Sequence, residues 1–282
     1  MTSDRIRITL LDGGRLRLDG GAMFGIIPKA LWQRLAPADE ANRIQLTTTC
    51  LLIESAGRRL LVETGIGNKY TPRDREIFAL SEHWLLDSLL ARGIDPVSID
   101  TVVLTHLHFD HAGGATRMDD TLGKPVPTFP RAEYVVQRGE WEDAMSGYCV
   151  MSATYRTENL APLAESGRLK LVEGDGEIAP GVWLRVLPGH TRHQQGVIIR
   201  DGARTLIQPA DLMPTAAHAG VRYNMSYDLL PYDNMKNKLR LLNEAAGGGW
   251  TLLLGQDAQH TAYSVNREGE ERFRLAPAEP VA

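Results

Sequence analysis

The sequence has few cysteines, no long apolar run and no cluster of basic residues, and each shortage excludes a class of protein. Its 282 residues include two cysteines, Cys50 and Cys149, which is too few for a disulfide framework. We interpret both as small packed side chains in a reducing compartment. No stretch approaches the roughly 18 apolar residues of a membrane-spanning helix. Residues 1–7 lack the apolar centre of a signal peptide, so a cytoplasmic location is expected.

The charge and composition are those of an ordinary globular chain. Hydrophobic residues make up 43% and charged residues 23%, and the formal net charge is −4. An acidic chain without a basic cluster gives no reason to expect nucleic acid or an acidic membrane as a partner. No internal repeat, low-complexity segment or linker interrupts the sequence. We therefore expect residues 1–282 to form a single domain.

Three of the eight histidines stand within six residues, in Thr105-His-Leu-His-Phe-Asp-His-Ala-Gly-Gly114. Residues 99–104 before them are β-branched and apolar, which predicts a buried strand. The two glycines after them let the backbone turn away. A surface loop that is merely rich in histidine is the alternative. The histidine cluster stands between a predicted strand and two glycines, and this position favours a loop that presents side chains for function.

The residue types in this loop suit a transition metal. Imidazole nitrogen and carboxylate oxygen bind Zn²⁺, Mn²⁺ or Fe²⁺, and Co²⁺ is a further candidate. His106 and His108, two apart in an extended chain, point to the same side and can share one ion. Asp110 and His111 can then turn towards a second ion. The loop therefore predicts a centre of two divalent ions, with zinc as the first choice.

The pattern His106-x-His108-x-Asp110-His111 resembles the metal motif of the metallo-β-lactamase superfamily. The resemblance implies an α+β fold, a four-layer αββα sandwich with a metal pair between two sheets. It also implies three later ligands: a histidine, a bridging aspartate and a last histidine. His190, which follows Val186-Leu-Pro-Gly189, and Asp211, which follows a predicted strand, match the first two.

The last ligand departs from the family pattern. Relatives place a histidine directly before an acidic residue, as in Gly-His-Asp, whereas this chain has Gln256 in that slot. The nearby His260 follows four residues later. By position the match is Gln256, and by ligand chemistry it is His260, which we include in the predicted ligand set. A loosely held second ion is the third alternative.

One further carboxylate stands near a predicted strand end. Family members usually carry Asp-Thr-Gly where this chain has Glu63-Thr-Gly65. The resemblance implies a carboxylate that orients a metal-bound imidazole and raises its basicity. A surface glutamate at a strand end is the alternative.

The resemblance to acyl-homoserine lactonases also predicts substrate contacts. Their entrance segment corresponds to the apolar residues 20–27, so Met23 and Phe24 are predicted to touch substrate, with core packing or a dimer contact as alternatives. A tyrosine that holds substrate in some lactonases is replaced by Pro214. Tyr223 is the predicted substitute, and the other candidates on the same loop are Tyr227 and His218.

Together these features predict a metal-dependent hydrolase acting on a small molecule. The resemblance implies opening of a lactone ring, above all an N-acyl homoserine lactone, with Asp110 passing a proton to the leaving group. A phosphotriesterase with the same ligands is the alternative. A non-catalytic scaffold with a degraded site is the alternative from another class, and Gln256 is the feature that favours it. The family's habit of dimerising implies a homodimer.

The periodicity predicts the remaining elements. The expected segments are a hairpin over 5–18, a hairpin over 47–63, a helix within 74–91, a strand over 133–137 followed by a helix over 138–145, an irregular insertion over 146–166, a hairpin over 197–208, a helix over 231–246 and a strand over 250–254.

Overall fold

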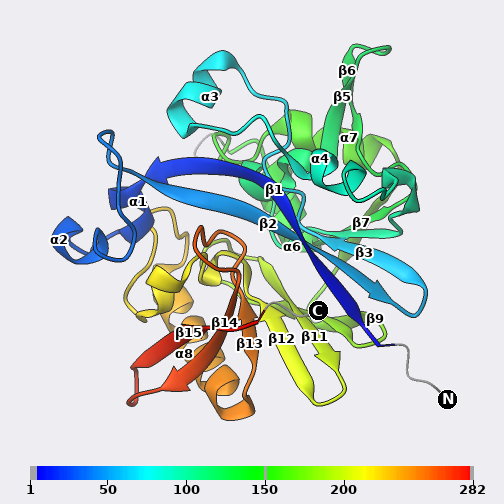
Figure 1. Ribbon diagram of the computed structural model, residues 1–282. Helices are drawn as coiled ribbons and strands as arrows, with labels where there is room; N and C mark the ends of the chain where they lie inside the picture. The colour runs from blue at the N-terminus through cyan, green and yellow to red at the C-terminus, as the bar shows by residue number, and fades with distance from the viewer. Residues whose placement is uncertain (1–4, 149–150, 280–282) are drawn as a thin grey trace. The chain divides into compact units, whose positions relative to one another are not determined.

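The computed structural model describes residues 5–148 and 151–279, so the predicted packing of Cys149 lies outside the described residues. The chain divides into two compact units (Figure 1). Among the described residues, unit 1 contains 5–15, 48–148 and 151–174, and unit 2 contains 16–47 and 175–279. The predicted single domain stays a prediction.

Unit 1 is built on a six-stranded sheet in the order β1-β2-β3-β4-β7-β8. The strands are β1 (Arg7–Asp19), β2 (Arg43–Ser55), β3 (Arg58–Val62), β4 (Thr101–Val103), β7 (Glu133–Gln137) and β8 (Leu169–Val172). The unit boundary falls within β1 and β2. From β3 to β8 the neighbouring strands are parallel. Their carboxyl ends therefore share one sheet edge, which is where loops in such sheets carry function.

Helices cover this sheet with apolar side chains. The helical segments of unit 1 are α3 (Pro72–Phe78), α4 (Leu85–Leu90), η1 (Pro96–Ser98), α5 (Phe109–Ala112), η2 (Gly113–Ala115), α6 (Arg138–Met145) and α7 (Thr157–Glu165). Leu89 of α4 and Leu163 of α7 share a fully buried core cluster with Val102 and Tyr134 of the sheet. A separate hairpin, β5 (Thr116–Asp119) and β6 (Lys124–Pro127), follows the histidine loop.

Unit 2 is built on a seven-stranded sheet in the order β15-β14-β13-β12-β11-β10-β9. The strands are β9 (Gly176–Ala179), β10 (Val182–Val186), β11 (Gln195–Asp201), β12 (Arg204–Gln208), β13 (Thr251–Leu253), β14 (Ala262–Arg267) and β15 (Phe273–Pro277). β12 and β13 are parallel, and β10 runs in the same direction because it is two antiparallel steps from β12. The chain therefore leaves β10, β12 and β13 at one sheet edge.

One long helix packs on the sheet of unit 2. The helical segments are α1 (Gly20–Phe24), α2 (Lys29–Trp32), η3 (Ala210–Leu212), η4 (Ala216–Ala219) and α8 (Pro231–Gly248). The long helix is α8, which is orange in Figure 1. Leu241 and Leu242 of α8 lie in a buried cluster with Ile207 and Leu252 of the sheet. The predicted α+β class is confirmed, and each unit pairs a sheet with helices. Within the described residues, none of the helices combines the length and the apolar character needed to cross a membrane.

Most predicted elements are confirmed. The hairpins β2–β3 and β11–β12, the strand β7 and the helix α6 fall where the sequence places them. α8 runs to Gly248, slightly beyond the predicted end, and stops at the left-handed Gly249. Cys50 is fully buried, as predicted, and burial raises the pKa of its thiol.

Three predictions are wrong. The hairpin expected over 5–18 is instead the single strand β1 (Arg7–Asp19). A Cβ at Gly13 would lie 2.3 Å from the backbone oxygen of Thr48, so this glycine permits close approach rather than a turn. The expected helix within 74–91 is two helices, because the first ends at Ala79 in the left-handed conformation. The expected irregular insertion contains α7, whose Pro162 reads as a helix breaker in the sequence but lies inside the helix.

Candidate metal centre

The histidine loop of unit 1 follows β4 directly, and the four predicted ligands on this loop are buried. His106 is fully buried, and His108, Asp110 and His111 are less than 10% exposed. One ring nitrogen of His106 lies within 4.8 Å of one ring nitrogen of His108, and the same holds for His106 and His111. Burying so many ionisable groups together is unfavourable unless a partner compensates them. A bound cation is a partner of the required charge.

The spacing of Asp110 and His111 fits a metal ion. The Nε2 atom of His111 lies 3.6 Å from Oδ2 of Asp110. Two atoms that each bind one zinc ion at about 2.1 Å can be at most about 4.2 Å apart. This pair is therefore close enough to bind one ion from the same loop, as the sequence predicts.

Glu63, the residue directly after β3, supports His111. Its Oε1 lies 3.4 Å from Nδ1 of His111 and accepts hydrogen bonds from the backbone nitrogen and the hydroxyl of Thr105. A carboxylate at Nδ1 orients the ring and leaves Nε2 for a ligand. Glu63 is 4% exposed, and its φ is +66°. Such a backbone is unusual for a residue other than glycine and is found at functional sites.

Two residues that the sequence analysis missed support the start of the loop. Glu140 of α6 is fully buried, and its Oε1 accepts hydrogen bonds from the Leu107 nitrogen at 3.1 Å and from the Tyr155 hydroxyl at 2.9 Å. The Tyr155 ring lies 4.9 Å from the ring of His108. Burial and the Glu140 carboxylate raise the pKa of Tyr155, so its hydroxyl stays protonated and donates. No sequence pattern marks either residue.

In unit 2, His190 follows β10 and is held by Asp228, a third residue that the sequence analysis missed. The Nδ1 atom of His190 lies 2.9 Å from Oδ1 of Asp228, and Nε2 lies 3.6 Å from Oδ2 of Asp211. All three side chains are buried. Nδ1 donates to Asp228, so Nε2 is left to face Asp211, again within the distance that one zinc ion allows.

Asp211 lies on η3 just after β12 and is 5% exposed. The residue before it, Ala210, has a φ of +53°. This left-handed conformation turns the chain sharply between the strand and the aspartate. Unit 2 therefore also carries backbone strain next to a predicted ligand.

The two alternatives for the last ligand have different surroundings in unit 2. Gln256 is 2% exposed, and its backbone is held by the Pro214 oxygen at 3.3 Å and the Thr47 nitrogen at 3.2 Å. His260 is exposed, and its ring lies edge-on to Tyr263 at 6.0 Å. The ligand role of each stays a prediction.

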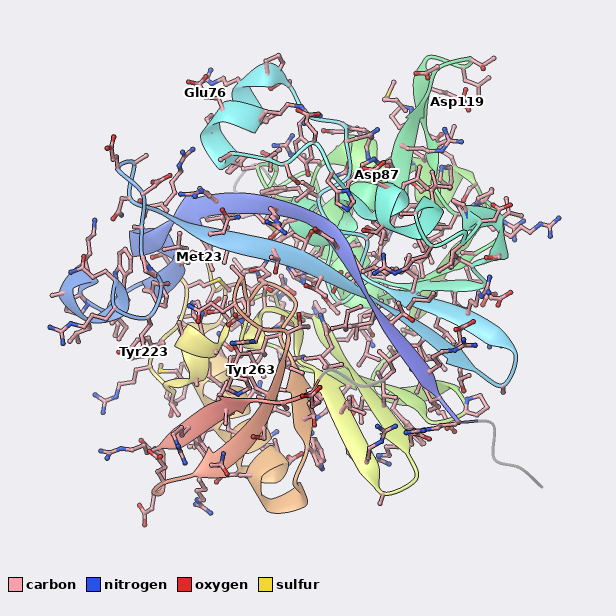
Figure 2. All side chains as sticks on the ribbon, in the orientation of Figure 1. Met23, Glu76, Asp87, Asp119, Tyr223 and Tyr263 are labelled. Atoms are coloured by element: carbon pink, nitrogen blue, oxygen red, sulfur yellow. The ribbon has the colours of Figure 1, made fainter. Side chains whose placement is uncertain are left out.

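The predicted substrate residues of unit 2 lie in a packed cluster. Met23 and Phe24 of α1 are fully buried, while Ile26 is 84% exposed and supplies the apolar surface of this segment. Phe24 stacks on His218 at 4.6 Å and meets Tyr223 edge-on at 6.2 Å (Met23 and Tyr223 are labelled in Figure 2). The substrate role of Met23, Phe24 and Tyr223 stays a prediction.

Two hydrogen bonds of the His218 ring hold this cluster together. Its Nδ1 accepts from the Thr215 hydroxyl, and its Nε2 donates to the Met23 backbone oxygen, both at 2.8 Å. Burial, followed by the Lys238 ammonium, lowers the pKa of His218 to about 4. The ring is therefore neutral at pH 7 and holds α1 against η4. Its role as a candidate substrate contact stays a prediction.

Comparison with known proteins places this chain in a family. The model of the metallo-beta-lactamase superfamily matches residues 43–256. An N-acyl homoserine lactonase from Bacillus cereus is 29% identical over 170 residues, which are 56% of this chain and 60% of that protein, so the chain spans about three fifths of that relative. The N-acyl homoserine lactonase AiiB from Agrobacterium fabrum is 26% identical over 277 residues, 91% of this chain and 95% of that one. The structure of a probable metal-dependent hydrolase from Staphylococcus aureus is 30% identical with a TM-score of 0.88 and covers 99% of this chain and 100% of that one.

Proposed function

This chain belongs to the metallo-beta-lactamase superfamily, and we propose that it is a metal-dependent hydrolase that opens the ring of N-acyl homoserine lactones. One observation carries the proposal: in each unit a buried histidine presents Nε2 to a carboxylate oxygen at 3.6 Å while a second carboxylate faces its Nδ1. Such carboxylate–histidine pairs are a regular feature of metal-binding sites. The lactone substrate is favoured because the named relatives are N-acyl homoserine lactonases.

The proposed cofactor is a pair of divalent ions, with zinc first because its ligands are imidazole nitrogen and carboxylate oxygen. The proposed ligands in unit 1 are His106, His108, Asp110 and His111. Those in unit 2 are His190, Asp211 and either Gln256 or His260. When bound, the ions supply Lewis acidity towards the carbonyl oxygen and lower the pKa of a water molecule.

Residues of this chain transfer the proton that the leaving ring oxygen needs. Hydrolysis adds water across the ring ester: the hydroxyl goes to the carbonyl carbon, the carbon–oxygen bond of the ring breaks, and a proton goes to the ring oxygen. We assign that proton transfer to Asp110, whose Oδ2 faces His111 and whose carboxyl is buried. Glu63 and Asp228 orient their histidines during the reaction.

Parallel turnover assays test the proposal. Zinc-loaded protein is incubated with N-hexanoyl homoserine lactone, and the product is detected by the mass of one added water. Paraoxon, a phosphotriester, is assayed in parallel. Asp110→Asn is compared with Asp120→Asn, an exposed aspartate in the β5–β6 turn, and zinc content is measured for both.

We expect turnover of the lactone and a loss in kcat of about 10²–10⁴-fold in Asp110→Asn, the range of general acid–base catalysis, with no loss in Asp120→Asn. Hydrolysis of paraoxon without hydrolysis of the lactone would replace the proposed substrate by a phosphotriester. A metal-loaded protein that hydrolyses neither would overturn the proposal.

A further inference from the structure

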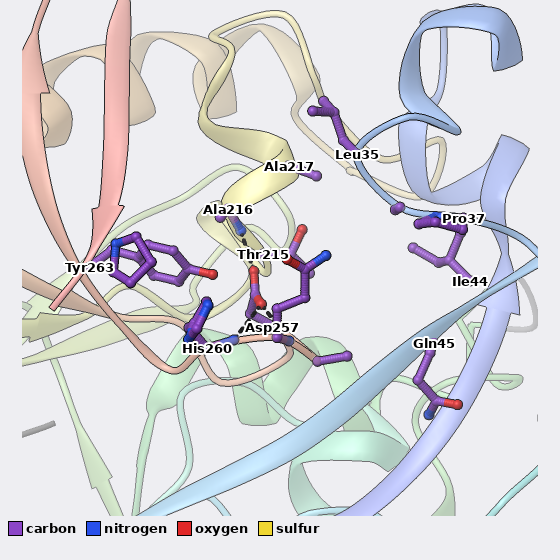
Figure 3. Close-up of a pocket in the computed structure, with 14 residues that line it drawn as sticks. Leu35, Pro37, Ile44, Gln45, Thr215, Ala216, Ala217, Asp257, His260 and Tyr263 are labelled. Atoms are coloured by element: carbon purple, nitrogen blue, oxygen red, sulfur yellow. Dashed lines mark hydrogen bonds between the residues drawn. The ribbon is translucent and has the colours of Figure 1, made fainter. Parts of the chain in front are cut away.

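An ammonium group is buried in unit 2. Lys238 of α8 is 1% exposed and is among the largest fully buried side chains of the described residues. Burying a charge is unfavourable unless the protein compensates it, so a buried lysine calls for a role. Lys238 does not line the pocket of about 460 Å³ that Figure 3 shows in unit 2, so a ligand in that pocket would not touch it. The role of Lys238 therefore lies in the protein groups that its ammonium contacts.

The ammonium of Lys238 holds the start of the loop that leads into α8, residues 223–230. Its Nζ donates to the Tyr223 backbone oxygen at 2.8 Å and to Oδ1 of Asn224 at 3.1 Å. The other end of the Asn224 amide, Nδ2, donates to the Pro231 oxygen at 2.7 Å. Asn224 therefore joins the start of the loop to the first residue of the helix, and Lys238 fixes the orientation of its amide.

The end of the same loop holds His190. Asp228 accepts from the Asn234 amide of α8 at 2.6 Å, and its other oxygen lies 2.9 Å from Nδ1 of His190. The Leu229 nitrogen donates to the His190 backbone oxygen at 3.0 Å. Asn234 and Lys238 are four residues apart, about one helical turn. α8 therefore holds the loop at two neighbouring points, and the loop in turn holds a proposed metal ligand.

We propose that Lys238 is a positioning residue for the metal centre, whose ammonium keeps residues 223–230 in place so that Asp228 can orient His190. The inference rests on the proposed function, which makes His190 a metal ligand, and deepens it. Lys238 acts through the loop and not by touching a ligand. The same ammonium fixes the backbone of Tyr223, a predicted substrate residue.

The protein keeps this charge although burial opposes it. Burial lowers the pKa of Lys238 to about 7, and the Asp228 carboxylate acts in the opposite direction. A methionine at this position avoids the cost of burying a charge, which offsets part of the hydrogen bonding that it loses. Lys238→Met should therefore loosen the loop more than it destabilises the fold. At pH 6, below this pKa, most of the lysine is charged, so the comparison is made at that pH.

The test removes the ammonium and measures zinc affinity by competition with a chromophoric chelator at pH 6. Lys238→Met keeps most of the side chain and removes its charge. Lys236→Met makes the same change on the same helix, where the more exposed Lys236 pairs with Asp233 at 2.7 Å, and is the matched control. Asn224→Ala removes an acceptor of the ammonium and serves if the Lys238 variant fails to fold.

Loss of the partner of a metal-binding histidine lowers metal affinity about 10–100-fold, and Lys238 acts through such a partner, so we expect Lys238→Met to weaken zinc binding about 3–10-fold. Lys236→Met should match the wild type. Asp228→Asn already removes the carboxylate, so adding Lys238→Met to it should change the affinity less than about twofold. An affinity of Lys238→Met within twofold of the wild type, or losses that add in the double variant, would overturn the proposal.

A measurement without metal separates a local role from a general loss of stability. Backbone hydrogen exchange is followed by mass spectrometry in the metal-free wild type and in Lys238→Met. Exchange should become faster in residues 223–230 and stay unchanged in β11, a central strand of the same unit. Exchange that becomes faster to the same extent in β11, or in neither segment, would contradict the positioning role.

Zinc affinity also separates this proposal from the proposed function. The expected loss of affinity in a chain that hydrolyses no lactone would support the role of Lys238 and overturn only the lactonase activity. Lactone hydrolysis with unchanged zinc affinity in Lys238→Met would overturn only the role of Lys238. A wild type that takes up no zinc would overturn both.

Discussion

The Nδ1 atom of His190 lies 2.9 Å from Oδ1 of Asp228, and both side chains are almost completely buried. The other oxygen of Asp228 accepts from the Asn234 amide at 2.6 Å and from the Met225 nitrogen at 3.2 Å. The carboxylate is therefore fixed on both sides and fixes the histidine ring in turn. This relationship determines which nitrogen of His190 is left for a metal ion.

Replacing Asp228 should weaken metal binding. Asp228→Asn removes the charge behind His190 and presents an amide to Asn234, and loss of such a partner lowers metal affinity about 10–100-fold. Zinc affinity is measured by competition with a chromophoric chelator. Asp233→Asn, which removes an exposed partner of Lys236, is the control and should match the wild type. An Asp228→Asn affinity within twofold of the wild type would refute the role of Asp228.

The positive φ of Glu63 gives a second prediction. Glu63→Ala and Glu63→Gly both remove the carboxylate that holds Thr105 and His111. Glycine adopts a φ of +66° readily, whereas alanine does not, so the glycine variant should be more stable by about 1 kcal/mol. Urea titration gives the free energy of unfolding of each. Equal stability, or a more stable alanine variant, would show that this backbone is unstrained.

Tyr155 offers a test of the support under His108. Tyr155→Phe keeps the ring beside His108 but removes the hydroxyl that donates to Glu140. Hydrogen bonds to charged groups contribute about 1.5–3 kcal/mol, and the free energy of unfolding should fall by that amount. Tyr148→Phe, at a tyrosine that is 63% exposed, should change it little. Equal effects in the two variants would contradict the role assigned to Glu140 and Tyr155.

His218 makes stability depend on pH. Its pKa is lowered to about 4 in the folded chain, so between pH 6.5 and 4 the unfolded chain binds more protons than the folded one. The free energy of unfolding should therefore fall as the pH falls through this range and should lose no more from this group below pH 4. The charged groups that act on the pKa of His218 are Lys238, which lowers it, and Asp228 and Asp211, which raise it.

The control for this effect is His218→Gln, which keeps polar atoms near Thr215 and Met23 but does not titrate. Urea unfolding of the wild type and the variant is compared at pH 7 and pH 4.5. The loss of stability between the two pH values should be smaller in the variant. An identical loss in both would assign the acid sensitivity to other groups.

How much of the site the sequence can predict depends on how far apart its parts lie along the chain. The proposed ligands of unit 1 stand within six residues and follow a strand, so their spacing and the family motif are enough to propose them. Glu63 was found from its place in a family pattern, and the contact with His111 is confirmed. Asp228 is 38 residues from His190, and no local pattern joins them. The fold brings such residues together, so a contact between them cannot be read from the local sequence.

The same distinction holds for the fold. Segments with strong alternation or helical spacing, such as β7 and α8, were predicted closely. The sequence analysis misses the strands β14 and β15, although β15 is one edge strand of the seven-stranded sheet and β14 is its neighbour. The hairpin expected over 5–18 is a single strand, because local propensity does not show that a neighbouring strand passes close to Gly13.

The most direct test of the central claim is the metal content of the chain. The protein is purified without chelators or added metal, and its metal is measured by elemental analysis before and after soaking in zinc. We predict two equivalents of divalent metal per chain, with Asp228→Asn holding less under the same conditions. A single equivalent after soaking would refute the pair of ions. No bound metal, and none taken up, would contradict the metal-dependent hydrolase itself.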